Sequence, residues 1–190
     1  MNTNEFNVKG IKITIIKKSE FEMVGYTKPA NLGDGSISLF VKDLVENGQM
    51  DKLSTTLKSQ QQIWVCLSDV SCSKNNTICP TCDMSCSGFQ VRCIVCVEKT
   101  ENHDFSNFKD NELFTLHLPA SEWTLFELND SQSAENLHKF GVYELVKETG
   151  YKWNESIRLH FDNEHECYNN GEWNPDKNYY FLLPVISNIN

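Results

Sequence analysis

The order of expected secondary-structure elements repeats once along this chain of 190 residues. Each half contains one stretch with the apolar spacing of an amphipathic helix, over 35–48 and over 133–150, and that stretch lies between stretches typical of β-strands. The pattern predicts two copies of a strand–helix–strand–strand unit, over about 10–100 and about 110–187. Because one helix covers only one face of its strands, we expect a single α+β domain, residues 1–190, with helices on one face of antiparallel sheet.

The two helices are predicted from apolar side chains that recur on one helical face. Asn47 and Gly48 supply a stop signal for the first helix, and Gly150 closes the second. We therefore expect each helix to pack as one layer on the strands of its own half. The apolar positions are Ile37, Phe40, Val41, Leu44 and Val45 in the first helix and Ala134, Leu137, Gly141, Val142, Leu145 and Val146 in the second.

The charge and hydropathy of the chain exclude some classes of partner. Its 17 basic and 26 acidic residues give a formal charge of -9, and no Lys/Arg cluster offers the concentrated footprint that nucleic acid requires. No stretch reaches the roughly 18 apolar residues of a membrane span, and the N-terminus lacks the pattern of a signal peptide. We therefore expect a cytoplasmic protein that binds neither nucleic acid directly nor a membrane.

Two tryptophans are placed by the alternation of side chains along strands. In one expected strand Ile63, Val65 and Leu67 share the face that should meet the helix, which leaves Trp64 for the opposite face. Trp123 lies in a strand of the second half and is expected on the corresponding side. A large aromatic side chain on a face without a helix is a candidate for a ligand groove, and the alternative is that it completes a second small core.

Four of the eight cysteines fall in one polar connection between two expected strands. Cys72, Cys79, Cys82 and Cys86 follow a C-x6-C-x2-C-x3-C spacing, and four thiolates can close a tetrahedral zinc site that orders such a loop. In a reducing cytoplasm, cysteines indicate metal binding, reactivity or burial before disulfides. Structural zinc is the prediction for this insert, residues 70–88, with unmetallated or redox-active thiols and an iron–sulfur cluster as the alternatives.

Three further cysteines lie in the strands on either side of the insert. If these strands form a symmetric hairpin, Cys66 pairs directly with Cys96 across the sheet. Cys93 alternates with valines along its strand, so we expect it to be a small residue of the core.

Five phrases follow one another in a recognisable order: FEMVGYTKP, GSISLFVKDLVENG, LPASEWTLFEL, TGY and FLLPV. In this order they resemble the GyrI-like small-molecule-binding domain, also called the bacterial transcription-activator effector-binding domain. The resemblance covers nearly the whole chain and implies two pseudo-symmetric halves with an aromatic ligand groove between them. Members of that family occur fused to DNA-binding domains or alone. Because the first expected strand begins near Ile11, we expect a stand-alone module.

The resemblance and the strand alternation together indicate a ligand site formed by Tyr26, Trp64, Trp123, Tyr143 and Tyr180. Drug-binding members of the family often carry a Glu four residues before the Pro of the last strand, where it meets a cationic ligand. In this chain that position is Tyr180. The usual carboxylate is therefore missing, although another acidic residue could supply one, and the tyrosine ring offers a π-face to a cation.

The leading hypothesis is a stand-alone binding or sensor domain for a small hydrophobic or cationic organic molecule, similar to multidrug-binding relatives. The resemblance also implies a protein partner in transcription regulation. One alternative is a hydrolase of electrophilic, cyclopropane-type molecules, in which a groove carboxylate activates water. A second alternative is a thiol- or metal-responsive sensor. The five histidines are scattered and no nucleophile–base pair is recognisable, so the catalytic residues of a hydrolase are unknown.

Overall fold

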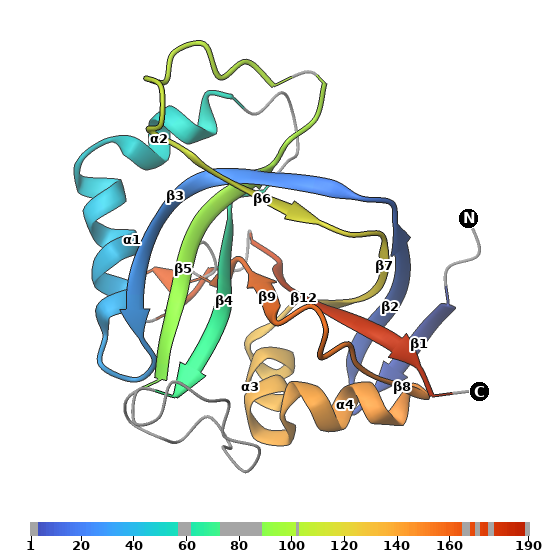
Figure 1. The fold of residues 1–190 in the computed structure, drawn as a ribbon. Helices are drawn as coiled ribbons and strands as arrows, with labels where there is room; N and C mark the ends of the chain where they lie inside the picture. The colour runs from blue at the N-terminus through green and yellow to red at the C-terminus, as the bar shows by residue number, and fades with distance from the viewer. Residues whose placement is uncertain are drawn as a thin grey trace. The chain divides into compact units, whose positions relative to one another are not determined.

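The computed structural model shows two compact units, each with its own set of paired strands and its own helices (Figure 1). Unit one comprises residues 1–20 and 119–190, and unit two comprises residues 21–118. The strands pair antiparallel in both units, so the chain is α+β, as the sequence predicted. The residues that the structure describes are 4–56, 62–72, 89–101, 103–164, 168–169, 172–174 and 177–188.

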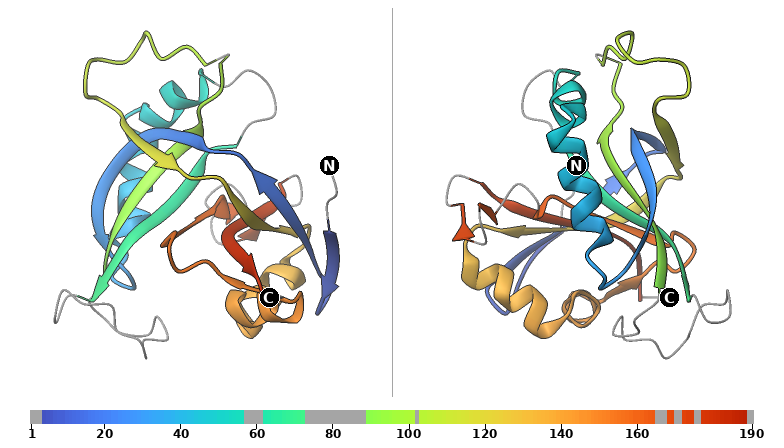
Figure 2. Two further views of the ribbon diagram at one scale, coloured as in Figure 1. Left: turned by 45° about the vertical axis from the view of Figure 1, so that its right-hand side comes forward. Right: turned by 90° about the vertical axis from the view of Figure 1, so that its left-hand side faces the viewer.

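The sheet of unit two consists, in spatial order, of β6 (Phe114–Leu118), β3 (Phe21–Asn31), β5 (Phe89–Glu98) and β4 (Trp64–Cys72). Two helices, α1 (Ser36–Glu46) and α2 (Gln49–Ser54), follow β3 along the chain. Gly48 separates them with a φ of 67°, a left-handed conformation that glycine adopts without strain. Figure 2 shows both helices along one face of these strands.

The core of unit two lies between its sheet and its helices. Phe40 and Leu44 of α1 and Leu53 of α2 are buried against the strands, where they join Val65 and Val95. Burial stabilises each of these side chains by about 1.5–3 kcal/mol relative to exposure. The other buried members of this core are Tyr26, Ala30, Met50, Ile63, Leu67, Val91, Cys93 and Val97.

The sheet of unit one consists, in spatial order, of β1 (Asn4–Val8), β2 (Ile11–Lys18), β7 (Ser121–Leu128) and β12 (Tyr179–Ser187). β8 (Tyr151–Trp153) and β9 (Leu159–Asp162) both pair with the other side of β12. The helices are α3 (Ser131–Phe140) and α4 (Val142–Glu148), and a two-residue ladder joins β10 (Tyr168–Asn169) to β11 (Glu172–Trp173).

The core of unit one also lies on the helix side of its sheet. Leu137 of α3 and Leu145 of α4 are buried together with Ile13, Phe126 and Phe181 from the strands. α3 begins at a capping box, in which the Asp130 carboxylate accepts a hydrogen bond from the backbone of Ser133 at 2.7 Å.

Each unit also contains strands from the other half of the sequence: β1 and β2 in unit one, and β6 in unit two. β2 pairs with β7 in unit one, and β6 pairs with β3 in unit two. The structure thus adds an opening strand to each strand–helix–strand–strand segment. The predicted bounds of the two repeats stay predictions.

The prediction of one continuous helix over 133–150 is wrong at Gly141. This residue has a φ of 77° and a ψ of 137°, so the helical backbone stops between α3 and α4. Glycine permits this break because it has no side chain to clash in that conformation. In the first helix, Phe40 and Leu44 are buried as expected, whereas Val45 is 56% exposed. β1, α2, β8 and the short β10 and β11 were not predicted from the sequence.

The cysteines of the strands are buried, and one predicted pairing is wrong. Cys93 is part of the core of unit two, as expected. Cys66 pairs with Ile94, and Cys96 pairs with Trp64, so the predicted direct pairing of Cys66 with Cys96 is shifted by two residues. The two thiols lie on one face as diagonal neighbours because paired residues of a ladder share a face.

No helix within the described residues is both long enough and apolar enough to cross a membrane.

Candidate functional site

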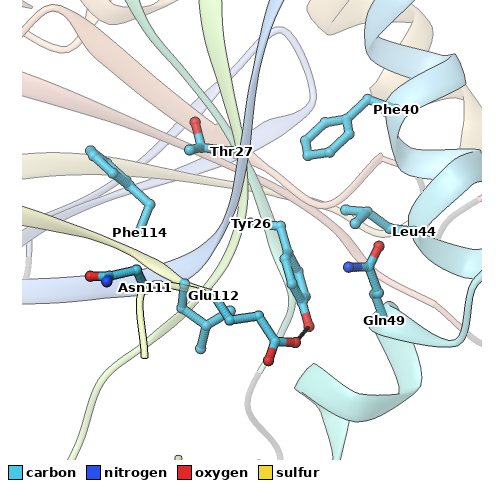
Figure 3. Close-up of a pocket in the computed structure, with 9 residues that line it drawn as sticks. Tyr26, Thr27, Phe40, Leu44, Gln49, Asn111, Glu112 and Phe114 are labelled. Carbon is cyan, nitrogen blue, oxygen red and sulfur yellow. Dashed lines mark hydrogen bonds between the residues drawn. The ribbon is translucent and has the colours of Figure 1, made fainter. Parts of the chain in front are cut away.

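A pocket of about 450 Å³ lies within unit two, and Tyr26 is one of the residues that line it (Figure 3). Its walls come from β3, from α1 and the start of α2, and from the residues that lead into β6. The lining residues are Tyr26, Thr27, Phe40, Leu44, Gln49, Asn111, Glu112, Leu113 and Phe114.

Tyr26 joins the core of unit two to this pocket. Its ring lies on the helix-covered face of β3 with Phe40 and Leu44, and the residue is only 6% exposed. A buried hydroxyl needs a hydrogen-bond partner, because an unsatisfied one costs about 1–3 kcal/mol. The Tyr26 hydroxyl donates to Oε1 of Glu112 at 3.1 Å, the contact drawn as a dashed line in Figure 3.

A turn over residues 109–112 directs the Glu112 side chain toward β3. The backbone N–H of Glu112 donates to the carbonyl of Lys109 at 3.0 Å, and the N–H of Lys109 donates to Oε2 of Glu112 at 2.9 Å. Asn111 adopts a φ of 63°, a left-handed conformation that asparagine tolerates better than most residues. The carboxylate is therefore oriented by its own turn as well as by Tyr26.

Lys52 of α2 neutralises this carboxylate. Its Nζ donates to both oxygens of Glu112, at 2.7 Å and 3.0 Å. The same Nζ lies 4.2 Å from the centre of the Phe108 ring, within the range of a cation–π contact. The Phe108 ring in turn lies 6.4 Å from that of Tyr26. We call these four residues, Tyr26, Lys52, Phe108 and Glu112, the Glu112 cluster.

The Glu112 cluster shifts the pKa of two of its members. The hydrogen bond from Lys52, followed by that from the backbone of Lys109, lowers the pKa of Glu112 from 4.5 to about 2. Burial, followed by the hydrogen bond to Glu112, raises the pKa of Tyr26 from 10.0 to about 12. Near neutral pH the cluster therefore holds a charged carboxylate and a neutral tyrosine.

The structure brings one of the five predicted ligand residues, Tyr26, into this pocket. Trp64 lies on the opposite face of the same sheet, because it alternates with the core residue Val65. Trp123 and Tyr180 lie on the face of the unit one sheet away from α3 and α4. The Trp123 ring has no exposed surface and is 5.9 Å from that of Phe161.

Tyr143, the fifth predicted residue, lies on α4 of unit one. It is 38% exposed, and its ring is 5.3 Å from the ring of Trp153. The roles of Trp64, Trp123, Tyr143 and Tyr180 in ligand binding stay predictions.

Three members of the Glu112 cluster were not identified from the sequence. Lys52 is 60 residues from Glu112 along the chain, and no local pattern connects them. Phe108 and Glu112 belong to the stretch TENHDFSNFKDNE, which the sequence alone presents as a polar linker. Its two phenylalanines, Phe105 and Phe108, are the signal that indicates packing, and both lie against the core of unit two.

The predicted zinc site falls mainly outside the described residues. Cys79, Cys82 and Cys86 are not among them, and Cys72 is described only as the last residue of β4. Within the described part of the chain, no group of His, Cys, Asp and Glu side chains is arranged to hold a metal ion. Structural zinc in this insert stays a prediction.

Comparison with known proteins yields similar solved structures. No family model and no curated protein matches the chain. SAV2435 bound to tetraphenylphosphonium superposes with a TM-score of 0.59 at 11% identity, over 98% of this chain and 94% of its own. A candidate bacterial transcription regulation protein from Staphylococcus aureus MU50 gives 0.55 at 14% identity, over 93% of this chain and 99% of its own. The integron cassette protein VCH_CASS2 of Vibrio cholerae gives a TM-score of 0.52 at 11% identity, over 98% of this chain and 100% of its own.

These likenesses concern the fold, because their sequence identities are all low. They extend over almost the full length of this chain and of each neighbour. The chain therefore has the GyrI-like effector-binding fold, as its sequence phrases indicated.

Proposed function

We propose that the protein binds a small organic molecule and that the pocket of unit two contributes the binding site. The observation that carries this proposal is the combination of apolar walls with one oriented carboxylate. Phe40, Leu44, Leu113 and Phe114 supply apolar surface, and Glu112 supplies a polar group at one end. Most small-molecule sites have this composition, with volumes of roughly 300–1,000 Å³.

The structural neighbours support an aromatic, cationic probe as the first ligand to test. SAV2435 has the same fold and is bound to tetraphenylphosphonium, an apolar cation with four phenyl rings. In the pocket of unit two, Phe114 offers a ring for stacking, and Glu112 offers a carboxylate whose charge Lys52 balances. Edge or stacked contacts between aromatic rings contribute about 0.5–1.5 kcal/mol beyond burial.

The biological role that follows is a sensor or binding component in transcription regulation. One neighbour is a candidate transcription regulation protein with the same fold. A domain that binds an effector without a DNA-binding surface of its own would pass the signal to a protein partner. The formal charge of -9 is consistent with this division of roles, because it disfavours direct contact with DNA.

The proposal is tested by calorimetric titration of the protein with tetraphenylphosphonium. We expect saturable binding that Phe114→Ala weakens up to about tenfold, the equivalent of one aromatic contact. Tyr143→Ala is the comparison variant, because it removes a ring that the sequence predicted for the ligand site and leaves the pocket of unit two intact. No saturable binding, or equal affinity of the wild type and Phe114→Ala, would contradict the proposal.

A further inference from the structure

We propose that the ammonium group of Lys52 occupies a cation subsite at one end of the pocket, and that a cationic ligand must displace it to bind there. The inference rests on the proposed function and assigns a regulatory contact to that site. It follows from the contacts, the exposure and the charge balance of the Glu112 cluster.

The surroundings of the Lys52 ammonium are those that recognise an organic cation. Both oxygens of Glu112 accept from Nζ, at 2.7 Å and 3.0 Å, and the ring of Phe108 faces it at 4.2 Å. A carboxylate combined with an aromatic face binds ammonium groups through charge and through the ring quadrupole. Lys52 therefore supplies from within the chain the group that an external amine or onium ion would supply.

The subsite keeps its shape when the lysine leaves. Glu112 still accepts from the Tyr26 hydroxyl at 3.1 Å and from the Lys109 N–H at 2.9 Å. Neither contact involves Lys52. The carboxylate therefore stays oriented for an incoming cation, which lowers the cost of binding because no reorganisation is required.

Lys52 itself can leave at little cost to the fold. α2 is anchored by Met50 and Leu53, which are buried, whereas the Lys52 side chain is 34% exposed. Ion pairs this close to solvent contribute little to stability, and a lysine stem has enough rotamers to carry its charge into water. With Lys52 in place, the carboxylate is already neutralised and attracts a second cation only weakly.

The test compares two probes on Lys52→Gln. Tetraphenylphosphonium is the cation, and triphenylphosphine oxide is an uncharged molecule with similar rings. We expect Lys52→Gln to bind the cation about fivefold to tenfold more tightly, because the Glu112 carboxylate then has a free negative charge near the surface. The affinity for the neutral probe should change little. Adding Glu112→Gln to this variant should remove the gain.

Lys99→Gln is the matched control, because it removes the same charge from unit two and breaks a 2.7 Å ion pair with Glu22 outside the pocket. Equal or weaker binding of the cation by Lys52→Gln, with the neutral probe still bound, would overturn the inference and leave the proposed function standing. Failure of both probes on the wild type and on the variant would overturn both.

Discussion

β3 of unit two and β7 of unit one hold the same place in their sheets, yet their sixth residues differ in what surrounds them. Each strand lies between a strand from the other half of the sequence, β6 or β2, and a long later strand of its own half, β5 or β12. The sixth residue of β7 is Phe126, which is fully buried and packs edge-to-face on Phe181 at 6.0 Å. The sixth residue of β3 is Tyr26, whose hydroxyl bonds to Glu112 beside an open pocket.

This difference shows how one arrangement of elements gives a closed apolar core in one unit and a pocket beside a carboxylate in the other. A phenylalanine side chain has no polar group and needs only apolar neighbours, so Phe126 is packed within the core of unit one. A tyrosine at the same place requires a polar partner, and the chain supplies one from the connection between β5 and β6. A carboxylate thus stands at the edge of an apolar core, where a ligand can reach it.

The largest effect is expected from Phe126→Ala. Removal of a fully buried ring should lower the free energy of unfolding by about 3–5 kcal/mol, because the transfer energy is lost and a cavity remains. Chemical denaturation measures this loss. A loss below about 1 kcal/mol would mean that Phe126 is not the packing centre that distinguishes unit one.

Gly25→Ala, in unit two, should lower the free energy of unfolding nearly as much as Phe126→Ala does. A Cβ at Gly25 would lie 1.9 Å from the carbonyl oxygen of Val95 and 2.5 Å from the Cα of Cys96, so the β3–β5 pairing would have to shift. Unit one has Leu125 at the corresponding fifth position of β7. We expect a loss of about 3 kcal/mol, at the upper end for overpacking.

Gly33→Ala is the control for this substitution, since its Cβ would meet open space and only its φ of +84° opposes a side chain. It should cost about 1–2 kcal/mol. Equal losses in the two variants would show that the close approach at Gly25 has no special cost.

Two substitutions, Phe126→Tyr and Tyr26→Phe, add a hydroxyl in unit one or remove one in unit two. Each should lower the free energy of unfolding by less than the changes above, and by unequal amounts. Phe126→Tyr places a hydroxyl in an apolar core and should cost about 1–3 kcal/mol. Tyr26→Phe removes one hydrogen bond to Glu112, which keeps other donors, and should cost about 1 kcal/mol. Thermal or denaturant unfolding measures both. The reverse order of the two losses would contradict the comparison.

The smallest effect is a shift in the ionisation of Tyr26. Its pKa of about 12, against an ordinary 10.0, means that the fold favours the neutral hydroxyl. Its contribution to stability is therefore complete below pH 10 and is lost as the pH rises toward 12. NMR of carbon-13-labelled tyrosine, assigned with Tyr26→Phe, follows this titration.

Glu112→Gln should lower the pKa of Tyr26 only part of the way, because burial is the larger cause of the shift. A return to the ordinary value in this variant would assign the whole shift to the carboxylate.

Much of the fold follows from local sequence patterns. The alternation in IKITIIKK and FQVRCIVCVE predicted β2 and β5 with the bounds that the structure has. The break at Gly141 was missed, because a glycine within an apolar stripe satisfies the helical spacing while its backbone leaves the helix. β8 was missed because three residues are too few for alternation to be detected.

The candidate site was less predictable than the fold. Tyr26 was identified through its place in the phrase FEMVGYTKP, whereas its partners Glu112 and Lys52 come from a linker and from a short helix. Their meeting depends on tertiary packing, which no spacing in the sequence encodes. The face on which each strand side chain lies was predicted more reliably than the strand register. A register shift by two residues leaves every side chain on the same face and changes only its cross-strand partner, as for Cys66.

The most direct test of the proposed site is a crystal structure of the protein with tetraphenylphosphonium. We expect density for the ligand within the pocket of unit two, against Phe114 and near Glu112, with the Lys52 ammonium moved away from the carboxylate. Density against Trp123 or Tyr180 with this pocket empty would contradict the assignment and would return the ligand site to the aromatic residues predicted from the sequence.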